Sequence, residues 1–295
     1  MEKFIISVPN EFSFGLALSF LERSPKELLH SVSNLHVAKA IQIGEKKIVF
    51  ELTGKKSNQL EVCVLSGSPL QKFEKTQLVQ FITEWFDLAT DLRPFYSLVK
   101  NDILLGPLTE KYFGYRIIGQ PDLFESLVWA VIGQQINLQF AYTLKQRFVE
   151  QFGEKHTVGD KVYYLFPTPN VVSTLSDEHL LPLQFSRQKS KYAVLIAQAF
   201  LSGGISKEKL KEMPFQQAKE KLMSIKGVGN WTANYALMKT FRYPEAFPLE
   251  DAGVHNAIKN LKKMKTKPTL DQVKRIFKKY KGWEAYATLY LWKSL

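Results

Sequence analysis

A glycine turn between two helical patterns is the feature that most constrains this chain. Residues 222–238 read LMSIKGVGNWTANYALM, in which the apolar spacing of a helix stops at Gly227-Val228-Gly229 and then resumes at once. Two glycines around one apolar residue predict a tight hairpin whose backbone another molecule can approach closely. The first N–H groups of the second helix have no acceptor inside that helix, so they suit a phosphate oxygen.

The first part of the chain has a different pattern. Strand-like runs occur at residues 4–8, His36–Ile43, residues 47–53 and residues 60–65. Turn signals at Gly44-Glu45 and at residues 54–58 separate the last three runs, which predicts an antiparallel meander. Helical patterns at residues 12–23 and 78–85 flank the strands, and the second has an apolar face that can cover a sheet. Residues 1–105 are therefore predicted to form an α+β domain.

Residues 106–295 show helical spacing, and no convincing strand pair follows Asp122. Apolar stripes at helical spacing lie near residues 124–132, 141–148, 192–201, 215–225, 254–261 and 283–292. Each stripe is long enough for a helix of a globular protein. The predicted fold class is therefore α+β, with an N-terminal antiparallel β-sheet layer and its helices followed by an all-helical bundle.

The charge balance favours a polyanionic partner. The chain has 40 Lys+Arg against 28 Asp+Glu, a net charge of +12, and a pI near 9.5, as is common in proteins that bind nucleic acid. Ten Lys/Arg and one acid, Asp271, lie between Lys259 and Lys281. A solvated helix face with a loop at residues 265–268 explains such a run equally well.

Cysteine usage and hydropathy exclude several classes of protein. The one cysteine, Cys63, rules out a disulfide framework, a multi-cysteine zinc site and a four-cysteine iron–sulfur cluster. The first residues, MEKFIISVPNEF, contain no long apolar run, and no later run approaches membrane-spanning length. We therefore expect a soluble, cytoplasmic protein that does not bind a membrane.

Asp251 is a carboxylate at the predicted start of a helix. It lies twenty-two residues after Gly229, in FPLEDAGVHNAIK, where another helix begins. An aspartate before an apolar-periodic run is a common N-cap, so capping alone also explains it. The helix dipole and free N–H groups favour the anion, and the two roles are compatible. Glu250 is the competing carboxylate.

The helix after the hairpin carries apolar side chains on one face. Trp231, Tyr235 and Met238 fall at i, i+4 and i+7. A stripe at this spacing usually belongs to a hydrophobic core. The alternative is that the aromatic members line a binding cleft.

The hairpin, its continuation NWTANY at residues 230–235 and the carboxylate at Asp251 together resemble the helix-hairpin-helix DNA glycosylases, in particular their 3-methyladenine (alkylbase) branch. The resemblance spans nearly the whole chain, is strongest over residues 122–292, and matches residues 1–105 more softly to the family's accessory domain. It implies excision of alkylated bases by base flipping and Asp251-assisted hydrolysis, which leaves an abasic site for base excision repair.

The resemblance also assigns roles around the hairpin. It implies that the backbone amides of Gly227, Gly229 and Thr232 hold a DNA phosphate, and that carbonyls of Met223, Ile225 and Gly227 hold a monovalent cation. It implies no other cofactor and no iron–sulfur cluster.

The same resemblance predicts the base pocket and the chemistry. Trp231, Tyr235, Trp292 and Phe20 would form an aromatic cleft suited to 3-methyladenine and 7-methylguanine, because cationic bases bind aromatic faces. In bifunctional relatives a lysine that forms a Schiff base occupies the position of Trp231. The missing amine predicts a monofunctional enzyme.

The segment GQQIN at residues 133–137 corresponds to the family's wedge region. Gln134 and Gln135 are therefore expected to contact DNA, with Gln135 filling the space that the extruded base leaves. A polar residue of a helix–helix turn is the simpler interpretation.

The expected partner is double-stranded DNA with damaged bases, bound by a monomer at the bacterial nucleoid. Two alternatives stay open. One is a sister glycosylase for other damaged or mismatched bases. The other is a non-catalytic helix-hairpin-helix DNA-binding protein, in which Asp251 is only a cap.

Overall fold

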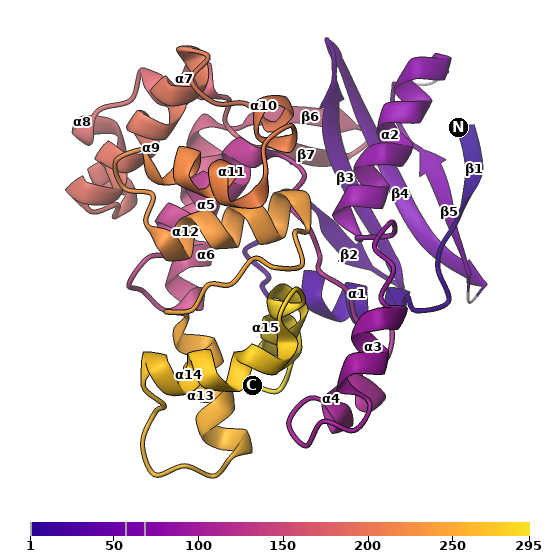
Figure 1. Cartoon of the computed structure of the whole chain (residues 1–295). Helices are drawn as coiled ribbons and strands as arrows, with labels where there is room; N and C mark the ends of the chain where they lie inside the picture. Colours follow the sequence, from indigo (N-terminus) through magenta and orange to yellow (C-terminus); the bar gives the residue numbers. More distant parts are fainter. Residues whose placement is uncertain (1, 57, 68) are drawn as a thin grey trace.

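The N-terminal part is built on one antiparallel sheet. The computed structural model describes residues 2–56, 58–67 and 69–295 (Figure 1). Its five-stranded sheet has the order β1-β5-β4-β3-β2, with strands β1 (Glu2–Ser7), β2 (Ser31–Ser33), β3 (His36–Ile43), β4 (Lys46–Lys56) and β5 (Gln59–Val64). The four predicted strands and the meander are confirmed, and β2 is an additional short edge strand. Residue 57, inside the predicted turn at 54–58, lies outside the described residues.

Two helices cover this sheet, as the apolar spacing predicts. Helix α1 (Phe14–Leu21) begins at Ser13, whose side chain accepts a hydrogen bond from the backbone N–H of Leu16. Helix α2 (Lys72–Trp85) buries Leu78 and Ile82 in the same core as Phe50 of β4. Burial of such side chains contributes about 1.5–3 kcal/mol each.

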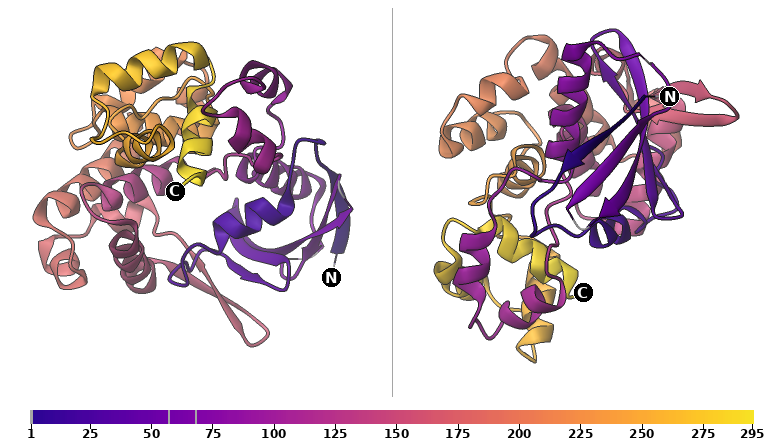
Figure 2. Two further views of the ribbon diagram at one scale, coloured as in Figure 1. Left: turned by 90° about the horizontal axis from the view of Figure 1, so that it is seen from below. Right: turned by 90° about the vertical axis from the view of Figure 1, so that its right-hand side faces the viewer.

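The rest of the chain is mainly helical (Figures 1 and 2). The helices are α3 (Arg93–Val99), α4 (Gly106–Lys111), α5 (Leu123–Gly133), α6 (Leu138–Phe152), α7 (Pro169–Ser173), α8 (Asp177–Leu180), α9 (Arg187–Leu201), α10 (Lys207–Lys211), α11 (Phe215–Met223), α12 (Asn230–Ala236), α13 (Ala252–Leu261), α14 (Leu270–Phe277) and α15 (Glu284–Lys293). A π-helical turn over Leu237–Phe241 extends α12. Every predicted helical stripe overlaps one of these helices, although the stripe at 215–225 extends beyond α11 and the stripe at 283–292 begins one residue before α15. The predicted fold class is confirmed.

The prediction that no strand pair follows Asp122 is wrong. Strands β6 (Glu154–Val158) and β7 (Lys161–Leu165) form an antiparallel hairpin between α6 and α7, with Gly159 at φ +58° in its turn. Tyr163 of β7 is buried with Ala38 and Val49 of the N-terminal sheet. The local apolar pattern is weak because the hairpin packs on a sheet more than a hundred residues away.

Helices α3 and α4 connect the two parts of the molecule. Phe95 and Leu105 are buried in the core of the helical part, and the Phe95 ring lies 5.7 Å from that of Tyr290 in α15. The Tyr96 and Tyr290 hydroxyl groups are 2.9 Å apart. The division of the chain into residues 1–105 and 106–295 stays a prediction. No helix of the described residues is long and apolar enough to cross a membrane.

Candidate active site and nucleic-acid interface

Asp251 caps a helix and still presents a carboxylate. Its backbone is extended, and its Oδ1 accepts a hydrogen bond of 2.9 Å from the N–H of Val254, which makes it the N-cap of α13. The capping interpretation is therefore confirmed in geometry. A cap uses one oxygen for one backbone donor, so it leaves acceptor capacity on both oxygens.

Two indole N–H groups also donate hydrogen bonds to the Asp251 carboxylate. The Nε1–H of Trp231 donates to Oδ2 at 2.9 Å, and the Nε1–H of Trp292 donates to Oδ1 at 2.7 Å. The three N–H donors to this carboxylate are neutral, and no ion pair joins Asp251 to a cation among the described residues. The carboxylate is thus fixed in orientation while its negative charge stays uncompensated, as electrostatic catalysis requires.

Glu250 is held differently. Both of its carboxylate oxygens accept from Nδ2 of Asn230, at 2.9 Å each, and the residue is exposed. Neither indole donates to it. Of the two neighbouring carboxylates, the geometry favours Asp251 over Glu250 as the one set among aromatic rings.

Gly253 permits the approach of Trp292, which the sequence pattern did not indicate. A Cβ atom on Gly253 would lie 2.9 Å from Oδ1 of Asp251 and 3.0 Å from Cδ1 of Trp292. A side chain there would force the indole or the carboxylate to move. The glycine is therefore needed for the Trp292–Asp251 hydrogen bond.

Three of the four predicted pocket aromatics lie around Asp251. The Trp231 and Tyr235 rings stack with centroids 5.3 Å apart, and the Tyr235 and Trp292 centroids are 6.5 Å apart. Trp231 and Trp292 are half-buried, whereas Tyr235 is 8% exposed. Met238, on the same helical face, is fully buried. Met238 therefore belongs to the hydrophobic core, whereas Trp231 and Tyr235 lie beside Asp251, so each interpretation of the stripe holds for part of it. We call Asp251, Trp231, Tyr235, Gly253 and Trp292 the Asp251 cluster.

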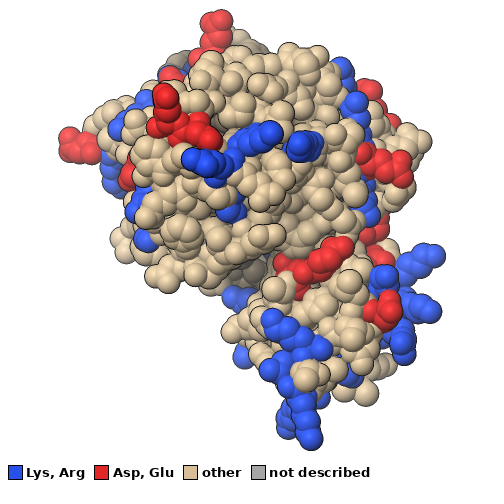
Figure 3. Space-filling view, turned by 90° about the vertical axis from the view of Figure 1, so that its left-hand side faces the viewer, with Lys and Arg blue, Asp and Glu red and all other residues tan. Residues whose placement is uncertain are grey.

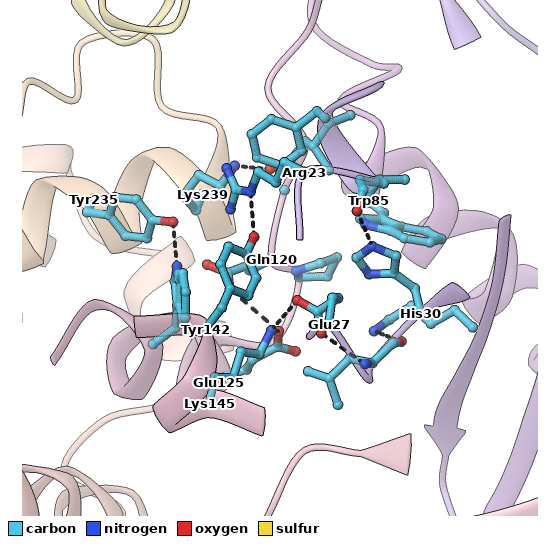
Figure 4. A pocket seen from close by; sticks show the side chains of 18 residues that line it. Arg23, Glu27, His30, Trp85, Gln120, Glu125, Tyr142, Lys145, Tyr235 and Lys239 are labelled. Carbon is cyan, nitrogen blue, oxygen red and sulfur yellow. Dashed lines mark hydrogen bonds and ion pairs between the residues drawn. The ribbon is translucent and has the colours of Figure 1, made fainter. Parts of the chain in front are cut away.

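The fourth aromatic, Phe20, lies in a cavity between the N-terminal and helical parts (Figure 4). This junction cavity has a volume of about 50 Å³, and Tyr235 also lines it. The guanidinium carbon of Arg23 lies 3.9 Å from the centroid of Phe20, and Nζ of Lys239 lies 4.8 Å from it. Basic side chains therefore lie over the Phe20 ring, whereas none lies over the other three aromatics among the described residues.

The carboxylates of the junction cavity are neutralised, in contrast to Asp251. Nζ of Lys145 lies 2.9 Å from Glu27 and 3.6 Å from Glu125 (Figure 4). Burial raises the pKa of Glu27, but Lys145 and His30 more than offset this and lower the pKa to about 2. Nε of Arg23 donates to the hydroxyl of Tyr142. Sequence reasoning missed these residues because their segments are more than a hundred residues apart.

The two hairpin glycines serve different needs. Gly227 has φ +99°, and a Cβ atom there would lie 2.2 Å from the ring of Tyr192 in α9, so the fold itself requires glycine. At Gly229 a Cβ atom would meet nothing within 4 Å, and its φ of −87° suits any residue. No steric contact with the described residues requires glycine at 229. Close approach by an external molecule is a physical reason for it.

The start of α12 presents free backbone donors. Its first backbone hydrogen bond runs from Ala233 N to Gly229 O, and Gly229 has no capping side chain. The N–H groups of Asn230, Trp231 and Thr232 precede that bond and have no acceptor among the described residues. Such donors at a helix N-terminus suit a phosphate.

The carbonyl groups named for a cation lie in the hairpin turn. Ile225 O accepts from Val228 N at 3.0 Å, and Gly227 O accepts from Nε2 of Gln134 at 3.1 Å. Each carbonyl keeps a second lone pair. These neutral oxygens, with the carbonyl of Met223, fit a weakly held monovalent cation in donor chemistry.

Gln134 and Gln135 divide between internal and external roles. Nε2 of Gln134 donates to Gly227 O at 3.1 Å and to Oγ1 of the buried Thr232 at 3.0 Å. Gln135 is exposed and has φ +57°, a conformation that side chains other than glycine adopt rarely. The structure thus ties Gln134 to the hairpin and presents Gln135 to solvent at the tip of the turn between α5 and α6.

Basic side chains gather on the lobe that contains α13 and α14 (Figure 3). Lys262, Lys263, Lys265 and Lys267 are all exposed, as are the five further Lys/Arg at 274–281. Within the described part of this segment, ion pairs join only Lys274 to Asp271 and Lys279 to Asp102. Most of this positive charge is therefore open to a polyanion.

Comparison with known proteins gives consistent matches along the chain. Residues 128–282 match the model of the HhH-GPD superfamily base excision DNA repair protein, and residues 28–127 match the 8-oxoguanine DNA glycosylase N-terminal domain. The chain is similar to a DNA-3-methyladenine glycosylase of Bacillus subtilis, with 41% identity over 99% of this chain and 96% of the relative.

Solved structures share the fold. A 3-methyladenine DNA-glycosylase from Archaeoglobus fulgidus has a TM-score of 0.85 at 23% identity, over 98% of this chain and 97% of that one. A Schizosaccharomyces pombe 3-methyladenine DNA glycosylase in complex with abasic DNA has a TM-score of 0.59 at 24% identity, over 67% of this chain and 94% of that one.

Proposed function

Because the chain belongs to the HhH-GPD superfamily of base excision DNA repair proteins, we propose that it is a monofunctional DNA glycosylase that removes alkylated bases, of the 3-methyladenine and 7-methylguanine type, from duplex DNA. Its relative from Bacillus subtilis is named a DNA-3-methyladenine glycosylase, and the similarity extends over nearly the full length of both chains. The observation that carries the mechanism is the Asp251 carboxylate, which three neutral N–H groups orient and which no cation neutralises among the described residues.

The chemistry follows from that charge. The extruded nucleotide loses its base when the C1′–N bond breaks, and the bond electrons leave with the base. Positive charge then builds on the sugar, and Asp251 stabilises it. A water molecule adds to C1′ and gives its proton to solvent, which leaves an abasic site. An alkylated cationic base is a good leaving group, so no strong general acid is needed.

Trp231 supports hydrolysis rather than lyase chemistry. Its indole Nε1–H binds Asp251 at 2.9 Å, at the position where bifunctional relatives have a Schiff-base lysine. Products should therefore contain intact abasic sites that break only on alkali or heat. Borohydride trapping of a covalent protein–DNA adduct during turnover would contradict this.

The base pocket that we propose consists of Trp231, Tyr235 and Trp292, with Phe20 at its inner end. Tyr235 belongs to both the Asp251 cluster and the junction cavity, so it joins the two. Aromatic faces attract cationic alkylpurines by cation–π interaction, worth about 0.5–2 kcal/mol.

The DNA grip that we propose uses the hairpin, the turn after α5 and the basic lobe. Amides of Gly227, Gly229 and Thr232 bind a backbone phosphate, and Gln135 fills the vacated stack. Carbonyls of Met223, Ile225 and Gly227 hold a monovalent cation, which would supply positive charge beside that phosphate. The working unit is a monomer.

Base release from methylated duplex DNA tests the function. Asp251→Asn should lower the rate by about 10²–10³-fold, because it removes charge stabilisation and little contact area. Binding to DNA with an abasic analogue should stay largely intact. The matched control is Glu250→Gln, which should keep nearly full activity. Activity retained in Asp251→Asn would leave that residue as a cap only, and no release by the wild type would favour a non-catalytic DNA-binding protein.

Gly229→Val tests the phosphate site separately. A Cβ atom at 229 would meet nothing within 4 Å, so the variant should fold, with a melting temperature lowered only by the poorer N-cap of α12. Affinity should fall for all DNA sequences alike, and wild-type binding should weaken with salt at a log–log slope of roughly 0.9 per phosphate neutralised. Unchanged affinity in a folded variant would place the phosphate elsewhere.

A further inference from the structure

Helix α9 contacts both turns that the proposed function assigns to DNA. Lys189 and Tyr192 are three residues apart, so they project from the same face of this helix. In Figure 1 α9 lies beside α5, and α5 beside α12, and these pairs are in contact. Lys189 contacts the turn that contains Gln135, and Tyr192 contacts the hairpin at Gly227.

Lys189 closes the C-terminal end of α5. Its Nζ donates to the carbonyls of Val131 at 3.0 Å, Ile132 at 2.8 Å and Gln134 at 2.6 Å. The last carbonyls of a helix have no intrahelical donor, and a cation there also interacts favourably with the helix dipole. The next residue is Gln135, in its strained left-handed conformation. Lys189 thus fixes the backbone from which the Gln135 side chain projects.

Tyr192 supports the hairpin from the same helix. Its ring fills the space where a Cβ atom of Gly227 would lie, at 2.2 Å from Cγ. Gln134 connects the two ends, because its Nε2 donates to Gly227 O and to Thr232 Oγ1. The turn of Gln135 and the hairpin are therefore joined twice, once through Gln134 and once through α9.

A lysine at position 189 costs free energy, because burial removes water from its ammonium group. Burial lowers its pKa to about 8, and no carboxylate pairs with it within the part of the chain that the structure describes. Its ammonium is satisfied by backbone carbonyl groups of one turn. A methionine of similar length would avoid the desolvation, so the bonds to that turn are a sufficient physical reason for the lysine.

We propose that Lys189 and Tyr192 are positioning residues, through which α9 holds the Gln135 turn and the phosphate-binding hairpin at a fixed separation, so that gripping the backbone drives Gln135 into the stack and the damaged base out of it. This inference rests on the proposed function. It predicts that loss of Lys189 impairs base extrusion more than binding.

The test uses the full chain with Lys189→Met, and with Lys191→Met as the matched control. Lys191 is exposed on the same helix, and its side chain makes no hydrogen bond or ion pair with any other described residue. The duplex carries 7-methylguanine beside 2-aminopurine, whose emission rises when its neighbour leaves the stack. An Asp251→Asn background slows base release, so that extrusion is observed before the base is lost. Lys189→Met should lower the emission rise several-fold while Kd for undamaged duplex changes less than twofold, and Lys191→Met should match its parent.

A double-mutant cycle separates positioning from simple loss of stability. In the Asp251-containing protein, Lys189→Met should lower kcat for base release at least tenfold and leave KM nearly unchanged. Combined with Gln135→Ala it should cause little further loss, because both changes act through the same turn. Additive losses, or an emission rise equal to that of the parent, would overturn the inference. If the wild type neither releases base nor raises emission, the proposed function itself is wrong.

Discussion

The Asp251 cluster and the junction cavity share Tyr235, but they differ in whether their carboxylates are paired with a cation. In the junction cavity, Glu27 and Glu125 lie beside the ammonium of Lys145. In the Asp251 cluster, two indoles and one backbone amide orient the carboxylate without neutralising it. Buried charge that is paired serves the fold, whereas a fixed unpaired charge is available to a reacting sugar.

The largest effect should come from breaking the pair in the junction cavity. Lys145→Met leaves Glu27 buried without its partner, so the free energy of unfolding should fall by about 3–5 kcal/mol. The control is Lys274→Met, which loses an exposed pair with Asp271 at 3.7 Å and should cost no more than about 0.5 kcal/mol. Urea unfolding measures both. Equal losses would mean that the cavity pair is no more important than a surface pair.

Acid unfolding should show the same pair as a pH dependence. The pKa of Glu27 is about 2 in the folded protein against an ordinary value of 4.5. The unfolded state therefore binds more protons between these values, and the stability from Glu27 is present above pH 4.5 and lost as the pH falls towards 2. The stability difference between wild type and Glu27→Gln should shrink by about 3 kcal/mol across this window. Exposed Glu150→Gln should follow the wild type, and a parallel Glu27→Gln curve would refute the paired assignment.

Gly253→Ala should damage the Asp251 cluster while the cavity stays intact. The added methyl group would lie 2.9 Å from Asp251 Oδ1 and 3.0 Å from Trp292, so the hydrogen bond between them must lengthen or break. We expect base release to slow about tenfold, equivalent to about 1.4 kcal/mol. Gly15→Ala, where a Cβ atom meets nothing within 4 Å, should be silent. Full activity in a folded Gly253→Ala protein would show that Trp292 need not orient Asp251.

The smallest effect should be a change in lesion preference. Trp292→Phe removes the indole N–H that donates to Asp251, so it should slow excision of every lesion. Its ring also has a weaker quadrupole, so 7-methylguanine excision should slow more than hypoxanthine excision, by a difference within about 0.5–2 kcal/mol. Single-turnover rates on both lesions measure it. Equal losses with a lowered melting temperature would assign Trp292 to the core and remove it from the pocket.

Local patterns were enough to predict the elements that carry the site. The glycines at 227 and 229 stop one helix and start the next, and the run after Asp251 has helical spacing, so both features depend only on neighbouring residues. The stripe of Trp231 and Tyr235 likewise follows from the helical period. These predictions agree with the bounds of α12 and α13 because capping and periodicity act over a few residues.

Contacts between distant segments were beyond the same reasoning. Hairpin β6–β7 packs on the N-terminal sheet through Tyr163. Arg23 meets Tyr142 across 119 residues, and Trp292 meets Asp251 across 41. No short-range sequence pattern predicts such pairs. The need for glycine at 253 likewise arises only because Trp292 packs against it.

Strand alternation, helical spacing and glycine turns are local properties, so they predicted a sheet layer and a helical bundle with a hairpin and a capping aspartate. Tertiary packing was needed to show that two indoles orient Asp251 with no cation beside it among the described residues. It also showed that the ring of Tyr192 requires glycine at 227, and that Lys189 binds the carbonyl groups before Gln135. The physical reason is that a residue's charge balance and free space depend on which distant segments pack against it.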